Sequence, residues 1–220
     1  MKQIYTFLLI ITFLLPLFSQ DRYGLKFSKI EWTKLSQRKP VLRKKKVPGA
    51  PWPEVKVYSL INASPEESMA VYFDYSEHKD YIPDLLRSDP LKYISSTDIE
   101  VSFEVSLSWP LANSKFITGN QLSKLKNGGY QIHWYPVTHT SAKDCTGEIM
   151  FLPFRRSTLL VYRNFTFPNS SLASLFKNRM FKNIKVTISA IVKRIESVKK
   201  EGGPGLAGYI RNLNKALHGE

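Results

Sequence analysis

The sequence contains only one cysteine, Cys145, among 220 residues. A single thiol excludes an internal disulfide framework and any cysteine-rich metal site. Also absent are a phosphate-cradling glycine loop, a G-x-S-x-G nucleophile motif, an H-E-x-x-H zinc motif and any internal repeat. These absences argue against several common enzyme classes, and we interpret Cys145 as a small buried apolar residue.

Long hydrophobic runs are also scarce, and the one exception lies at the N-terminus. Lys2 is followed by a nearly unbroken apolar run of about fifteen residues, Ile4 to Phe18, and then by Ser19-Gln20-Asp21. A membrane span needs about 20 such residues. The pattern therefore predicts a signal peptide over residues 1–20 and an exported protein, periplasmic or secreted, with an uncleaved anchor as the alternative.

Acidic residues are few, 18 against 32 Lys and Arg, which gives a net charge of +14. The excess lies in residues 21–53, with ten basic against two acidic residues, and in residues 177–200, with eight against one. Such clusters suggest nucleic acid in a cytosolic protein, but export argues against that partner. We expect Arg43, Lys44, Lys45 and Lys46 to contact an anionic membrane surface. The alternative is that these residues form a solvated basic face that binds nothing.

The most regular pattern is an apolar stripe near the C-terminus. Its members recur in steps of three or four and are Leu172, Phe176, Met180, Ile184, Ile188, Ile191, Ile195 and Val198. This spacing predicts one long amphipathic helix over residues 171–200, capped by Asn169, Ser170 or Ser171 and ended by Gly202 and Gly203. Residues 201–220 then form a short C-terminal amphipathic helix through Leu206, Ile210, Leu213 and Leu217.

The sequence before this helix consists of short segments typical of strands. Residues 21–53 form an ordered basic lead-in with a first strand at 39–46, paired with a strand over 54–63. Ser64-Pro65-Glu66-Glu67 is a capping box that begins a helix. Further strands are expected over the ranges 101–108, 115–122, 130–135, 147–152 and 157–167.

With this order, residues 30–200 resemble the START-like lipid-transfer domains of the helix-grip superfamily, which also holds polyketide cyclases. The motifs that carry the resemblance are Trp32, Lys45-Lys46-Val47-Pro48-Gly49, Ile61-Asn62-Ala63-Ser64-Pro65-Glu66-Glu67, Phe73-Asp74-Tyr75, Tyr81-Ile82-Pro83, Ser108-Trp109-Pro110-Leu111, Phe116-Ile117 and Thr158 to Tyr162. The resemblance implies an α+β helix-grip fold, in which a curved antiparallel sheet wraps around a long C-terminal helix. It also implies a ligand cavity between the sheet and that helix.

Residues 21–200 would then form the START-like domain, and we can name the side chains expected to line its cavity. They are Phe103, Val105, Leu107, Trp109, Phe116, Ile132, Trp134, Tyr162, Met180, Ile184 and Ile188. The family often places a charged residue inside, and Arg155, Arg156 and Arg163 are candidates for this polar anchor, with Arg163 preferred. The alternation in residues 157–167 does not show which face of this strand points inward.

We therefore expect an exported protein that sequesters or carries a lipid or another apolar small molecule, without a cofactor and as a monomer. Two alternatives stay open. One is a cyclase- or dehydratase-like enzyme in the same cavity, with Glu104 and Glu148 as the best-placed carboxylates. The other is an envelope docking protein with a filled core. A metal site at His133, His139 and Cys145 is disfavoured, because Pro136 and a polar stretch separate them.

Overall fold

The computed structural model describes residues 22–107, 112–139, 142–169 and 173–219. Its elements in chain order are η1 (Arg22–Gly24), α1 (Lys29–Ser36), β1 (Val41–Lys45), β2 (Glu54–Ile61), α2 (Pro65–Phe73), η2 (Tyr75–Glu77), α3 (His78–Tyr81), β3 (Leu85–Tyr93), β4 (Asp98–Val105), β5 (Ser114–Lys124), β6 (Tyr130–His139), β7 (Ala142–Phe154), β8 (Ser157–Pro168), α4 (Ala173–Glu201) and α5 (Gly203–His218). None of the helices in the described residues is both long and apolar enough to span a membrane. The predicted signal peptide and the predicted caps Ser170 and Ser171 lie outside the described residues.

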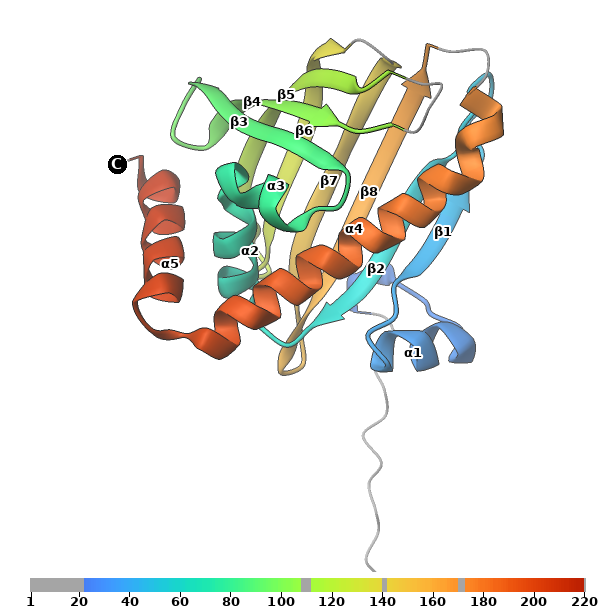
Figure 1. Cartoon of the computed structure of the whole chain (residues 1–220). Helices are drawn as coiled ribbons and strands as arrows, with labels where there is room; N and C mark the ends of the chain where they lie inside the picture. The colour runs from blue at the N-terminus through green and yellow to red at the C-terminus, as the bar shows by residue number, and fades with distance from the viewer. Residues whose placement is uncertain (1–21, 108–111, 140–141, 170–172, 220) are drawn as a thin grey trace, which may run out of the picture.

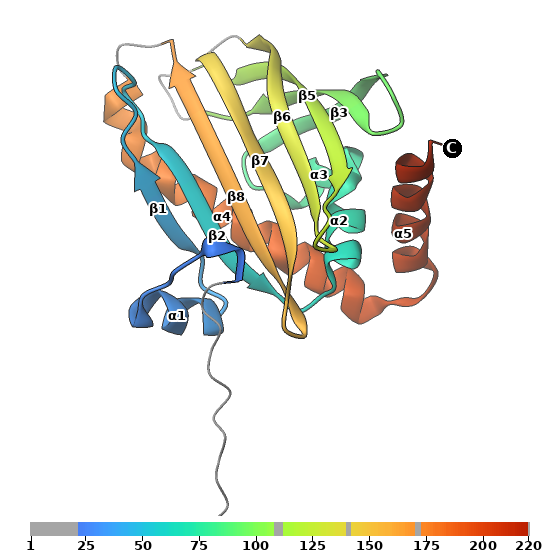
Figure 2. The ribbon, with the colours of Figure 1, turned by 180° about the vertical axis from the view of Figure 1, so that it is seen from behind.

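The strands form one antiparallel sheet in the order β1-β2-β8-β7-β6-β5-β4-β3. Strands that follow each other in the chain are neighbours in the sheet, except β2 and β3. Strand β2 pairs with β8 instead, so an early and a late segment of the chain lie side by side. Register irregularities in the β3–β4, β5–β6 and β7–β8 ladders interrupt the regular pairing, and such bulges increase strand bending and twist. The curved sheet partly encloses α4, as Figures 1 and 2 show from opposite sides. This is the expected α+β helix-grip architecture.

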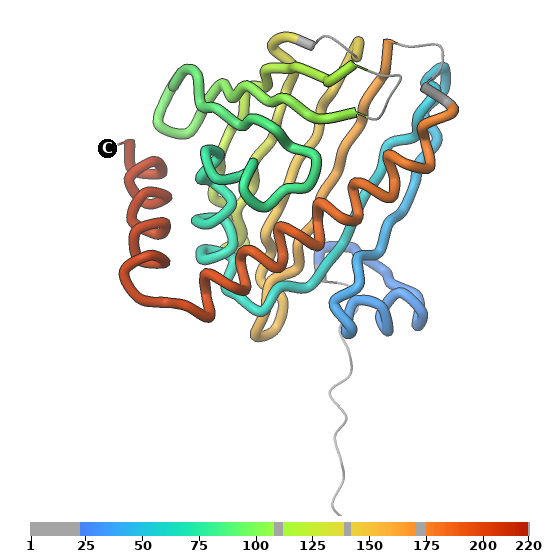
Figure 3. Tube along the Cα trace, in the orientation of Figure 1, coloured from blue at the N-terminus to red at the C-terminus, as the bar shows by residue number. Residues whose placement is uncertain are grey.

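Helix α4 crosses the inner face of the sheet, which is the face turned toward it (Figure 3). The C-terminal half of its apolar stripe is deeply buried: Ile188 is 0% exposed, and Ile191 and Ile195 are each 1% exposed. These side chains belong to the main core cluster with Val57, Val101 and other inward-facing strand residues. The long helix predicted from the spacing therefore begins and ends close to its expected positions and packs through the predicted stripe.

A second core lies on the outer face and is built from the lead-in segment. Phe27 and Leu35 pack there against Tyr58, together with residues of β7 and β8. Helix α1 begins at a capping box in which Ser28 accepts a hydrogen bond from the Glu31 amide and Glu31 accepts one from the Ser28 amide. The lead-in is thus ordered, as expected, and it covers apolar residues on the outer side of β2, β7 and β8.

Helix α5 packs onto the same domain through Leu213, which is 0% exposed. Its Tyr209 hydroxyl donates to Glu77 at 2.7 Å, and Arg194 of α4 donates both to Glu77 at 2.8 Å and to the Tyr209 oxygen at 3.1 Å. This cluster joins α4, α5 and η2. Helix α4 ends before Gly202 and Gly203, as the sequence predicts, and their φ values of 60° and 65° favour glycine.

His78 is a buried titratable group at the start of α3. Its Nε2–H donates to the carbonyl oxygen of Tyr72 at 2.8 Å, and the rings of Tyr72, Tyr75 and Tyr81 surround it. Burial lowers the pKa of His78 from 6.5 to about 4. The folded protein therefore holds this imidazole neutral at a pH where the unfolded chain would protonate it.

We expect this group to make the fold acid-sensitive. Because the folded pKa is the lower one, its contribution to stability is fully present above pH 6.5 and is lost as the pH falls toward 4. Urea unfolding at pH 7 and pH 5 should show a loss of about 2 kcal/mol from this group. His78→Gln keeps a donor for Tyr72 but cannot titrate, so it should lose less stability over the same interval. An equal loss in both proteins would contradict the assignment to His78.

Candidate functional site

The candidate site lies where the packing between α4 and the sheet thins out. On α4, Ile184 is only partly buried at the edge of the main core, and Met180, one turn earlier, lies beyond that core. On the sheet, Val101 is 0% exposed, whereas Phe103, the next inward-facing residue of β4, is partly exposed. Apolar surface on both layers is therefore left accessible toward the N-terminal end of α4.

Aromatic side chains form the sheet side of this region. Phe103 and Phe116 occupy paired positions of β4 and β5, and their rings are stacked with centroids 5.4 Å apart. Tyr162 of β8 lies 5.4 Å from the ring of Trp134 on β6. Burial raises the pKa of Tyr162, so its phenol stays neutral at physiological pH. These rings give the site an apolar wall with one hydroxyl.

The structure thus places the predicted lining residues in two groups. Phe103, Phe116, Tyr162, Met180 and Ile184 are partly accessible, whereas Ile132, Trp134 and Ile188 are buried in the main core. The remaining ones are Val105 and Leu107, which are partly exposed at and beyond the end of β4, and Trp109, which lies outside the described residues.

Polar groups that the sequence did not single out face the same layer. Asn164 and Thr166 share a face of β8 with Tyr162, because alternate strand residues point the same way. Asn164 Nδ2 donates to Thr166 Oγ1 at 3.1 Å, and Cys145 Sγ lies 3.7 Å from the same oxygen. Burial raises the pKa of the Cys145 thiol, so it is not an activated nucleophile. This cluster could contact the polar end of an amphipathic ligand.

Arg163 does not agree with its expected role as the polar anchor. It neighbours the inward-facing Tyr162 along β8 and therefore points to the outer face. There its guanidinium donates to Glu148 at 2.8 Å and to Glu54 at 3.1 Å. Both faces of residues 157–167 carry apolar side chains, which is why alternation alone could not assign its direction.

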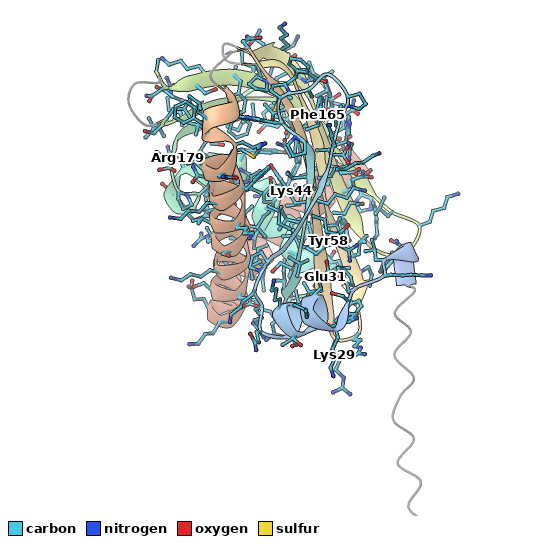
Figure 4. All side chains as sticks on the ribbon, turned by 90° about the vertical axis from the view of Figure 1, so that its right-hand side faces the viewer. Lys29, Glu31, Lys44, Tyr58, Phe165 and Arg179 are labelled. Carbon is cyan, nitrogen blue, oxygen red and sulfur yellow. The ribbon has the colours of Figure 1, made fainter. Side chains whose placement is uncertain are left out.

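The four basic residues expected at a membrane surface do not form one patch. Arg43 is half-buried on the outer face, where Glu31 accepts from its Nε and Nη2 at 2.9 Å each. Lys44 points the other way, with Nζ 3.8 Å from the centroid of the Phe181 ring of α4 (Figure 4). Lys45 and Lys46 are exposed, and within the described ranges neither makes a contact of this kind. The structure therefore does not support Arg43 as a membrane contact.

The side chains considered for catalysis or metal binding also lie away from the aromatic region between α4 and the sheet. Glu104 accepts from Asn113 at 3.0 Å and Glu148 from Arg163, both on the outer face. His133 points outward between the inward-facing Ile132 and Trp134. In the part of the chain that the structure describes, no three His, Cys, Asp or Glu side chains are grouped to hold a metal ion.

Two open clefts flank this domain. One, of about 400 Å³, lies between α2, the β3–β4 hairpin and α5, and Phe73, Tyr93 and Tyr209 contribute to its wall. Tyr75 also lines it, and its buried hydroxyl has no hydrogen-bond partner among the residues that the structure describes. The other, of about 510 Å³, lies between α1, the end of β2 and the β7–β8 turn. Neither coincides with the aromatic region between α4 and the sheet.

Sheet order, the long helix across the inner face and the accessible aromatic layer together define a START-like helix-grip fold. No protein-family model matches the sequence, and comparison with curated proteins gives no match. Solved structures do match it, at identities that establish the fold alone. The STAR-related lipid transfer protein from Xanthomonas axonopodis has a TM-score of 0.65 and 16% identity over 71% of this chain and 93% of its own.

Two further structures show the range of proteins with this fold. The lipid transfer and protein localization domain of human StarD13 has a TM-score of 0.58 and 14% identity, over 72% of this chain and 83% of its own. The ZhuI aromatase/cyclase from Streptomyces sp. R1128 has a TM-score of 0.56 and 13% identity, over 74% of this chain and 99% of its own. Lipid-transfer proteins and cyclases thus both resemble this chain, and the choice between them depends on its own residues.

Proposed function

We propose that this protein binds one lipid, or another apolar or amphipathic small molecule, between α4 and the inner face of the sheet. The observation that carries the proposal is the accessible apolar surface on both layers, from Met180 and Ile184 on α4 and Phe103, Phe116 and Tyr162 on the sheet. Binding pockets for such ligands are mostly apolar with a few placed polar groups. Asn164 and Thr166 are polar groups of this kind.

The driving force would be removal of the ligand's apolar surface from water. At about 25 cal/mol per Å², covering about 300 Å² would contribute about 7 kcal/mol before the cost of ordering the ligand. Binding of this kind needs no cofactor and no bond-making step. A carrier or sequestering role follows, and export through residues 1–20 forms part of the same proposal.

The residues around the layer favour binding over acid–base catalysis. A cyclase- or dehydratase-like mechanism needs titratable groups that converge on the ligand. Glu104 and Glu148 lie on the outer face, and the inward-facing Asn164 and Thr166 do not titrate. The solved cyclase of the same fold keeps the enzyme as the alternative, and a filled core would instead favour a docking protein.

Native mass spectrometry of the purified mature protein, followed by organic extraction, tests the proposal. We expect an adduct of one lipid per chain, whose mass also names the ligand class. A protein that is empty and also fails to take up a fluorescent fatty acid would contradict lipid binding. Conversion of a bound molecule during incubation, seen as a change in the extracted mass, would support the enzyme instead.

A further inference from the structure

The cleft of about 510 Å³ between α1, the end of β2 and the β7–β8 turn has a composition unlike that of the aromatic layer. Arg38, Arg155 and Arg156 line it, and its lining residues in the described part of the chain include no acidic side chain. Three apolar residues surround it, of which Leu60 is partly exposed, whereas Leu35 and Ile61 are each 0% exposed. The three guanidinium groups come from two segments more than one hundred residues apart, which Figures 1 and 2 show at the same edge of the domain.

Arg38 occupies a backbone position at which glycine is usual. It follows the end of α1 with a φ of 58°, and its amide donates to Leu35 O at 2.9 Å. The next amide, that of Lys39, donates to Lys34 O at 2.9 Å. This pair of bonds is a Schellman motif, whose left-handed residue is commonly glycine because a side chain costs free energy there.

Arg155 occupies a second position of the same kind. Phe154 and Ser157 are paired at the end of β7 and the start of β8, so Arg155 and Arg156 form a two-residue hairpin turn. The φ of Arg155 is 54°. Two-residue turns with a positive φ at the first position favour glycine there. The chain thus carries an arginine at two glycine-type positions, and both arginines line one cleft.

We propose that this cleft binds an oxyanion, a phosphate or carboxylate, that is attached to an apolar group. Strained backbone clusters at functional sites, and guanidinium groups match phosphate and carboxylate geometry. The partly exposed Leu60 would contact the apolar part of the ligand. Arg38 is already paired with Glu196, which also accepts from the Asn62 amide at 2.8 Å, and this holds its guanidinium against α4.

The test compares two variants of equal charge. Arg155→Gly with Arg156→Gln alters the cleft, whereas Lys126→Gln with Arg211→Gln removes two exposed charges elsewhere. By calorimetry, we expect the cleft variant to bind dihexanoyl phosphatidic acid at least about tenfold more weakly than the unaltered protein. The control should stay within about twofold. The cleft variant should also unfold at a higher temperature, because glycine relieves the strained φ.

Three further probes separate the possible ligand sources and sites. If the unaltered protein binds phosphatidylcholine vesicles that contain phosphatidic acid and the cleft variant does not, the ligand is a lipid headgroup in a membrane. If the protein binds only the soluble dihexanoyl phosphatidic acid, the ligand is a free molecule. Equal affinity for inorganic phosphate would overturn the role of Leu60 and the apolar part of the ligand. Ile184→Asp, in the aromatic layer, should leave cleft binding unchanged. If both charge variants bind as the unaltered protein does, or lose affinity equally, the cleft is not a site.

Discussion

A single methyl group added at residue 147 should destabilise the protein by about 3 kcal/mol, because the core has no room for it. Gly147 lies on the inner face of β7, where a Cβ would overlap the carbonyl oxygen of Arg163 and Cζ2 of Trp134. The carbonyl belongs to the paired strand β8, so it cannot move without disturbing the ladder. The indole packs directly over Gly147, and its displacement would disturb the contact with Tyr162.

Urea unfolding of Gly147→Ala measures the effect, and Gly208→Ala provides the matched control. At Gly208, inside α5, the nearest atom to a new Cβ is Arg211 Nη2 at 3.9 Å. Alanine is the better helix former, so this control should gain up to about 1 kcal/mol. A stability change within about 0.5 kcal/mol for Gly147→Ala would show that β7 and β8 can separate locally, and would contradict tight packing at this position.

Strong periodicity made α4 and most of the strands predictable. The stripe from Phe176 to Val198 follows one helix face, and the capping box at Ser64 begins α2 as expected. Helix α1 was not expected, although its apolar residues were expected to be ordered. Strand β3 was missed because it has Pro90 within it and two register irregularities, which interrupt simple alternation. Proline is tolerated there because β3 is an edge strand.

The site was less predictable than the fold, for a reason specific to this sheet. Outer-face residues of β8 such as Leu159 and Val161 are buried by the lead-in, so both faces of the strand are apolar. A strand covered on both faces loses the alternation that assigns its direction. Alternation therefore does not show that Arg163, the preferred candidate for the polar anchor, points outward, and it does not single out the inward-facing Asn164 and Thr166. Their direction depends on packing between segments distant in sequence.

Two substitutions one helical turn apart on α4 should separate ligand binding from folding. Ile188 is 0% exposed in the main core, so Ile188→Asp buries a charge and should cost at least about 4 kcal/mol. Ile184 is partly accessible at the edge of the core, so Ile184→Asp should cost only about 1–2 kcal/mol. It should nevertheless weaken uptake of a fluorescent fatty acid at least about tenfold, since the carboxylate would face the ligand.

The two variants can be compared directly, because both place an aspartate on the apolar face of α4. The two positions differ in how far they are exposed. Helix propensity and net charge change equally, which leaves position as the only variable. Circular dichroism and urea unfolding establish the folded fraction, and a fatty-acid titration then reports binding per folded molecule. Full uptake by a folded Ile184→Asp protein would place the ligand elsewhere than between α4 and the sheet. Loss of uptake without loss of fold would instead locate the ligand beside the N-terminal half of α4.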